Sequence, residues 1–212
     1  MLLTCVGAVS AISNGGFEDP ALADGTSFQA NMGSGLTGWT IEGGNVDLIK
    51  EYWIPAELKQ SLDLSGDSRG TISQQIATDP GKTYKLTFSM AGNPECNGLN
   101  TDPQNMKSLK VYWDNAIVGT LPFDTAGKTF AALGWTPVTI ANLPSSAAAA
   151  TNLRFIDDSS GSDTRCGVTL DAVNVEPEQA IPTPEFPTMA LPAALIVGML
   201  GAVLFIQRTK EQ

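Results

Sequence analysis

The stretch from residue 83 to residue 91 reads TYKLTFSMA, and its side chains alternate between apolar and polar. Tyr84, Leu86, Phe88 and Met90 occupy every second position, and polar residues separate all four of them. Successive side chains of a β-strand point to opposite faces, so this period of two predicts a strand with one buried face and one solvated face.

The same alternation recurs along the chain and sets the fold class. Similar short runs lie at residues 45–49, 60–64, 70–78, 107–113, 116–121, 137–141, 152–156 and 167–175. Turn residues separate them, and the chain has 21 Gly and 13 Pro with only 16% charged residues. About nine short strands without an ordinary amphipathic helix predict an all-β protein, a two-sheet jelly-roll sandwich, over residues 12–176.

Composition excludes several function classes. The chain has no histidine, which removes the usual general base and every Ser-His or Cys-His catalytic arrangement. Its 12 Lys+Arg against 22 Asp+Glu give a formal net charge of −10, and the basic residues are scattered. A chain of this charge repels phosphate backbones, so we expect no nucleic-acid partner.

The C-terminal part changes character after the last predicted strand. Residues 177–188 form a proline-rich linker, which we expect to be extended. Residues 189–206 (MALPAALIVGMLGAVLFI) contain no charge and are long enough for a transmembrane helix. Residues 207–212 include Arg208 and Lys210, and cations after an apolar span favour the cytoplasmic side. The preceding domain is therefore expected outside the cell.

The first residues look like an export signal. Residues 1–11 (MLLTCVGAVSA) resemble the apolar part of a signal peptide ending in small residues, although a basic start is lacking, so the signal is expected to be truncated. A first β-strand is the alternative. Removal of this segment leaves Cys96 and Cys166, which allow one disulfide in an oxidising compartment. A pair of free thiols is the alternative.

The tail resembles a known sorting signal. Its Pro184-Glu185-Phe186 motif, the apolar span and the basic end follow one another in the order found in the PEF-CTERM signal of archaeal surface proteins. The resemblance implies recognition of the motif by an archaeosortase, removal of the span and transfer to a lipid. The physical pattern by itself predicts only a membrane anchor.

The external part is similar to the choice-of-anchor C family. That likeness covers about residues 13–176 and rests on the ordered motifs NGGFE at 14–18, GW at 38–39, VDLI at 46–49, SLDLSG at 61–66, ISQ at 72–74, PGKTY at 80–84, AGNP at 91–94 and LDAV at 170–173. The family is related to a plant cell-wall domain of unknown function and to galactose-binding-like carbohydrate-binding modules. The resemblance implies a galactose-binding-like jelly roll.

Two carboxylates are candidates for a metal site. Glu18 follows the first motif and Asp171 lies in the last predicted strand, and a jelly roll commonly brings its first and last strands together. Ca²⁺ takes six to eight oxygen ligands, so these groups with nearby carbonyls could hold a structural Ca²⁺. Related modules hold calcium in this region. The alternative is that both carboxylates cap turns.

Sugar recognition needs aromatic faces together with amide or carboxylate groups. Tyr52 and Trp53 stand in a loop after a predicted strand, and the loop from 93 to 105 supplies Asn93, Asn97 and Asn100. We therefore predict carbohydrate binding by these five residues. Packing in the core is the alternative for Trp53.

Together these features predict an exported, non-catalytic surface protein that binds a carbohydrate of the envelope or its surroundings. The alternative is a structural or adhesive surface protein without a small ligand. A glycoside hydrolase or esterase is a more distant alternative, because glycosidases need only two suitably spaced carboxylates and no pair stands out in the sequence.

Overall fold

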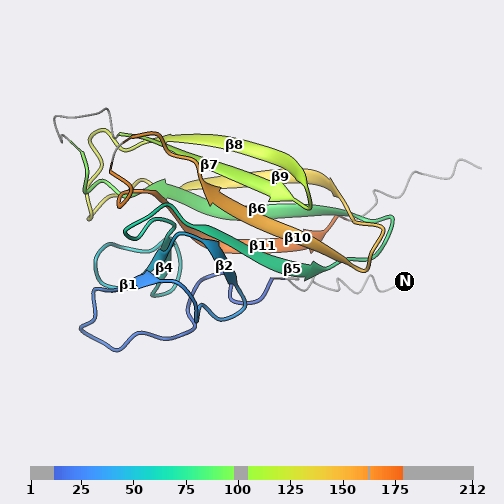
Figure 1. Ribbon diagram of the computed structural model, residues 1–212, viewed down its shortest axis with the longest axis horizontal. Coiled ribbons are helices and arrows are strands. Elements are labelled where there is room, and N and C mark those ends of the chain that lie inside the picture. The colour runs from blue at the N-terminus through green and yellow to red at the C-terminus, as the bar shows by residue number, and fades with distance from the viewer. Residues whose placement is uncertain (1–11, 98–104, 162, 179–212) are drawn as a thin grey trace, which may run out of the picture. The chain divides into compact units, whose positions relative to one another are not determined.

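The computed structural model describes residues 12–97, 105–161 and 163–178. Eleven strands make up two antiparallel sheets within these residues, and they are joined by turns and loops (Figure 1). In chain order the strands are β1 (Phe28–Met32), β2 (Thr40–Gly43), β3 (Val46–Ile49), β4 (Ser61–Asp63), β5 (Thr71–Ala77), β6 (Thr83–Gly92), β7 (Met106–Trp113), β8 (Ala116–Asp124), β9 (Thr136–Pro144), β10 (Ala150–Asp157) and β11 (Val168–Pro177).

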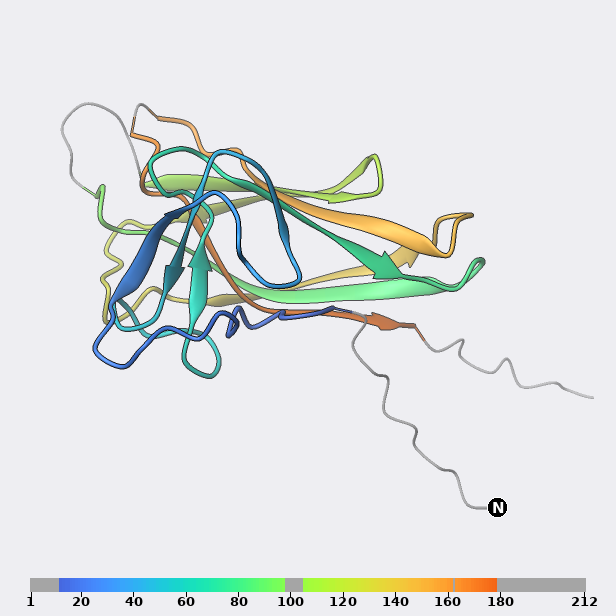
Figure 2. The ribbon, with the colours of Figure 1, turned by 60° about the horizontal axis from the view of Figure 1, so that its bottom comes forward.

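The strand order shows how the sandwich is assembled. The six-stranded sheet runs β1-β3-β4-β11-β6-β9 and the five-stranded sheet runs β2-β5-β10-β7-β8. The long strands β5 to β11 form the body, and the short N-terminal strands gather toward one end of it (Figures 1 and 2). The described residues therefore form an all-β sandwich, as the alternation predicts.

Register across the six-stranded sheet separates its two faces. One row, paired from strand to strand, points into the core and consists of Leu48, Leu62, Leu170 and Met90, each at most 2% exposed. The next row lies on the other face of the sheet and consists of Asp47, Asp63, Thr169 and Ala91. Because side chains alternate along each strand, the apolar pattern that fills the core also places two carboxylates side by side on the outer face.

Strands β1 and β2 are absent from the strands predicted by sequence. Four of the five residues of β1 are exposed, and β2 has no buried residue. Edge strands this short and this exposed carry no apolar alternation to recognise. Strand β1 also contains a bulge at Asn31, which has φ 56°.

The predicted segments at the two ends lie outside the described residues. These are the export signal at 1–11, most of the linker, the sorting motif Pro184-Glu185-Phe186, the apolar span at 189–206 and the basic tail. Within the part of the chain that is described, no helix is long and apolar enough to span a bilayer.

Candidate functional site

A cavity of about 160 Å³ lies on the outer face of the six-stranded sheet, over β1, β3 and β4. Its floor includes the neighbouring carboxylates Asp47 and Asp63, which are paired across β3 and β4. Loop residues complete the wall, among them Tyr52, Asn93 and Arg165. The cavity therefore brings together residues that are more than 100 positions apart in the sequence.

Aromatic rings form one wall of the cavity. The Tyr52 ring lies 5.3 Å from that of Phe28, 5.6 Å from that of Trp53 and 4.6 Å from that of Phe130, measured between ring centroids. Phe28 is 41% exposed and Tyr52 is half-buried, so both offer ring surface to a ligand. These tilted contacts fix the rings against one another.

Trp53 lines the same cavity but is itself only 4% exposed. Its indole Nε1 donates a hydrogen bond to Ser61 Oγ at 2.9 Å, and its ring belongs to the core cluster. The structure thus gives Trp53 the packing role that the sequence left open as an alternative. Direct contact of Trp53 with a sugar stays a prediction.

Carboxylates also line the cavity. Asp47 Oδ1 accepts a hydrogen bond from the backbone N–H of Asn31 at 2.6 Å, and Asp67 Oδ2 accepts one from Asn31 Nδ2 at 2.8 Å. Burial raises the pKa of Asp47, and the charges of Asp67 and Glu95 raise it further. Burial also raises the pKa of the Tyr52 hydroxyl, with an added contribution from the Glu95 carboxylate beside it. The cavity is therefore acidic.

Asp63 differs from the other three carboxylates because it is 1% exposed. Its Oδ2 accepts a hydrogen bond from Asn93 Nδ2 at 2.8 Å, and its Oδ1 accepts one from the backbone N–H of Ser65 at 3.0 Å. Burial raises the pKa of Asp63 well above its usual range. Asp63 thus joins the floor of the cavity to the loop that follows β6.

The three predicted asparagines differ in their position relative to the cavity. Asn93 lines the cavity and is buried, and its Oδ1 accepts a hydrogen bond from the backbone N–H of Glu95 at 2.9 Å. Asn97 instead exchanges two hydrogen bonds of 2.6 Å with Thr125 and is not among the lining residues. Asn100 lies outside the described residues. Asn93 therefore supports the cavity, and Asn97 holds a neighbouring loop.

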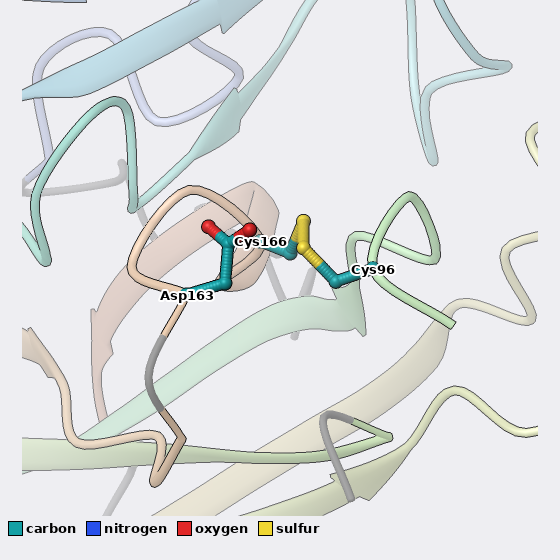
Figure 3. A group of neighbouring side chains, drawn as sticks. All are labelled: Cys96, Asp163 and Cys166. Atoms are coloured by element: carbon teal, nitrogen blue, oxygen red, sulfur yellow. A yellow bond between two sulfur atoms is a disulfide. The ribbon is translucent and has the colours of Figure 1, made fainter. Parts of the chain in front are cut away.

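A disulfide joins Cys96 and Cys166 at the rim, as the sequence predicts. Each cysteine is next to a cavity residue, Glu95 on one side and Arg165 on the other. Figure 3 shows Asp163 beside the two bonded sulfur atoms. Although a cysteine pair and a carboxylate can bind a metal, here both sulfur atoms are used in the disulfide. The trio is therefore a cross-link and not a metal centre.

Arg165 is the basic residue of the cavity wall, and Asp163 holds it. The guanidinium donates two hydrogen bonds to the Asp163 carboxylate, at 3.0 and 2.6 Å. This partner lowers the pKa of Asp163 to about 2. The negative charge of Asp163 balances that of the guanidinium, which also interacts with the charges of Glu95 and Asp67.

The two predicted metal ligands both hold the loop at residues 56–60. Asp171 Oδ2 accepts hydrogen bonds from the backbone N–H groups of Ala56 and Glu57, and Glu18 Oε1 accepts those of Lys59 and Gln60, all at 2.8 to 2.9 Å. Burial of Asp171 raises its pKa to about 7. These bonds match the capping alternative, and a calcium ion at this place stays a prediction.

Of the thirteen lining residues, ten are absent from the predicted site, among them Asp67, Glu95 and Arg165. Phe28 and Asn31 belong to the unrecognised strand β1, and Asp47 and Asp63 sit at positions where a strand normally faces water. The sequence signal for the two carboxylates is that each predicted strand carries an Asp between apolar residues, at the second position of VDLI and the third position of SLD. Only strand pairing shows that the two carboxylates are neighbours.

Comparison with known proteins gives one relative and several similar folds. A stretch of 98 residues, 42% of this chain, is 33% identical to halomucin of Haloquadratum walsbyi, and it spans 1% of that protein's length. The Stig cyclase Fisc from Fischerella sp. TAU, solved in complex with an indole compound, has a TM-score of 0.53 at 16% identity, covering 82% of this chain and 100% of the cyclase. At this identity the likeness shows a shared fold alone.

TmCBM61, solved in complex with β-1,4-galactotriose, has a TM-score of 0.48 at 13% identity and covers 81% of this chain and 100% of the module.

Two family matches cover most of the chain. Residues 183–209 match the PEF-CTERM archaeal protein sorting domain, which confirms the likeness of the tail to that signal and implies processing by an archaeosortase. The protein is therefore a surface-anchored, extracellular protein. Residues 10–176 match the protein family of unknown function DUF642. The chain belongs to the DUF642 family.

Proposed function

We propose that this protein binds a carbohydrate in the cavity over β1, β3 and β4 and does not cleave it. The observation that carries the proposal is that the exposed Phe28 ring and the half-buried Tyr52 ring line one cavity together with the carboxylates Asp47, Asp67 and Glu95. Aromatic faces cover the C–H face of a sugar ring, and carboxylates accept hydrogen bonds from its hydroxyl groups.

The size and stiffness of the cavity support this assignment. Its volume of about 160 Å³ is smaller than the roughly 300–1,000 Å³ typical of sites for drug-sized ligands. It suits one sugar residue of a longer chain. The floor belongs to paired strands, and the disulfide fixes the rim, so little ordering is required when a ligand binds.

The burial and the hydrogen bonds of Asp63 favour binding over hydrolysis. A glycosidase needs a carboxylic acid that can protonate the leaving oxygen. Asp63 has the raised pKa of such an acid, but both of its oxygens already accept protein hydrogen bonds and it is 1% exposed. Release of product from chromogenic glycosides would overturn the non-catalytic part of the proposal.

The test of binding is a glycan array followed by calorimetry with the full chain. We expect Tyr52→Ala to weaken binding at least tenfold, because the Tyr52 ring lines the cavity and packs against the rings of Phe28, Trp53 and Phe130. Tyr112→Ala is the matched control, since Tyr112 lies on β7 of the other sheet against Arg154. Equal affinity of Tyr52→Ala and the wild type, or no glycan bound by the wild type, would refute the proposal.

We also propose how the protein is anchored at the cell surface. The tail match supports recognition of Pro184-Glu185-Phe186 by an archaeosortase, removal of the apolar span and attachment to the membrane through a lipid. Mass spectrometry of the mature C-terminus tests this proposal. A surface protein that still carries the apolar span at residues 189–206 would contradict cleavage. The finer family name, choice-of-anchor C, and the galactose-binding-like jelly roll remain predictions.

A further inference from the structure

The charges around the cavity are strongly unbalanced. Asp47, Asp67 and Glu95 line it together with the buried Asp63, and Arg165 is the basic lining residue. Asp163 holds the Arg165 guanidinium through two hydrogen bonds. A ligand that enters the cavity therefore meets a negative potential next to the exposed Phe28 ring and the half-buried Tyr52 ring.

A metal ion is one cation that could be considered for this acidic cavity. Ca²⁺ requires six to eight oxygen atoms at about 2.3–2.6 Å. Among the described residues, three metal-ligating side chains approach within 4.8 Å of one another only at Cys96, Asp163 and Cys166, where the sulfur atoms are already bonded together. The cavity acids Asp47, Asp67 and Glu95 therefore do not form a group of this kind.

A set of carboxylates beside aromatic rings suits an organic ammonium group. Such a group has several N–H donors that can reach separate acceptors, and it is attracted to the face of a Tyr or Phe ring. The exposed Phe28 ring and the half-buried Tyr52 ring lie within the same wall. An acidic sugar would instead place its charge among three carboxylates.

Resting on the carbohydrate binding proposed above, we infer that the cavity selects a sugar that carries a free amino group and rejects uronate sugars. The ammonium group lies between the Glu95 and Asp67 carboxylates and the aromatic wall. Glu95 is the side chain best placed to make this choice without supporting the fold, because it is exposed at the rim and lies beside the Tyr52 hydroxyl.

The test compares three probes by calorimetry at about pH 6 and low salt. They are the glucosamine trimer, the same trimer with N-acetylated amines, and trigalacturonate. We expect the glucosamine trimer to bind at least tenfold more tightly than its acetylated form, and trigalacturonate to show no binding. High salt should reduce the preference for the amine, because screening weakens interactions between charges near the surface.

A pair of matched variants assigns the effect to the cavity. We expect Glu95→Gln to reduce the preference for the free amine by at least threefold. Glu176→Gln, which changes the same residue type at the far end of β11, should keep the preference of the wild type. Equal reduction by both variants would show a general field of the acidic protein and would overturn the assignment to Glu95.

The outcomes separate this inference from the function on which it rests. If the acetylated trimer binds as tightly as the free amine, or if trigalacturonate binds, the charge selection is wrong while carbohydrate binding stands. If a broad array shows no glycan bound at all, the proposed function itself fails.

Discussion

Reduction of the Cys96–Cys166 disulfide should destabilise the protein while leaving its sandwich recognisable. The two cysteines are 70 residues apart in sequence, and they link the loop after β6 to the loop before β11. Those strands already pair at this end, where the backbone N–H of Asn93 donates a hydrogen bond to the carbonyl of Gly167 at 2.9 Å. The native arrangement therefore does not depend on the disulfide alone, and its effect falls mainly on the unfolded chain.

The expected loss follows from the length of the closed loop. For a loop of 70 residues, the chain-entropy relation gives about 4 kcal/mol at 25 °C. In a domain of this size, that loss corresponds to a decrease in Tm of roughly 8–16 °C. A typical domain has a free energy of unfolding of about 5–15 kcal/mol, so the reduced protein should remain folded at 25 °C but with a small margin.

The assay is urea unfolding of the full chain with and without dithiothreitol. We expect the reductant to lower the midpoint of the wild type and to leave that of the double variant Cys96→Ala, Cys166→Ala unchanged. Thiol titration of the unreduced, unfolded wild type should find neither Cys96 nor Cys166 reactive. An identical midpoint with and without reductant, after thiol titration has verified reduction, would refute the entropic reasoning.

Three further predictions follow from other contacts. The pKa of the buried Asp171 is raised from 3.8 to about 7. The contribution of this residue to the free energy of unfolding is therefore complete below pH 4 and is lost, by about 4 kcal/mol, as the pH rises through 7. In urea unfolding between pH 4 and 8, the free energy of unfolding should decline less in Asp171→Asn than in the wild type. Gly167→Ala should lower the free energy of unfolding by at least about 2 kcal/mol, because its Cβ would lie 2.0 Å from Asp157 Oδ2, whereas Gly33→Ala, where no atom lies within 4 Å, should be neutral in the same assay. If Ca²⁺ bridges Glu18 and Asp171, millimolar EDTA should lower the Tm and added Ca²⁺ should restore it; an unchanged Tm would leave both carboxylates as caps of their loop.

The strands that could be predicted from sequence are those in which burial alternates. Strand β6 contains the TYKLTFSMA run, and its buried positions are the apolar ones. Strand β1 could not be predicted in this way, because its residues pack mainly through one neighbour at a sheet edge and remain exposed. Apolar and polar residues alternate because one face of a strand is buried, so a strand without a buried face shows no alternation.

Only part of the candidate site could be predicted from the sequence, and the reason differs from that for the strands. Tyr52 and Trp53 could be named because aromatic residues in a polar loop are unusual, and both line the cavity. Asp47 and Asp63 could not, since each by itself looks like an ordinary residue on the wet face of a strand. Their proximity depends on the register between β3 and β4, which no local pattern specifies.

Register also explains how the fold can keep two carboxylates next to each other. Like charges directly opposite on paired strands are unfavourable, and burial of a charge adds a further cost. Asp63 offsets part of that cost with hydrogen bonds from Asn93 and Ser65, and its burial raises its pKa, whereas Asp47 is only half-buried. The place of Asp63 in the sheet is therefore explained by its contacts within the fold, and the half-buried Asp47 is the carboxylate of the pair that remains available to the N–H and O–H donors of the proposed ligand.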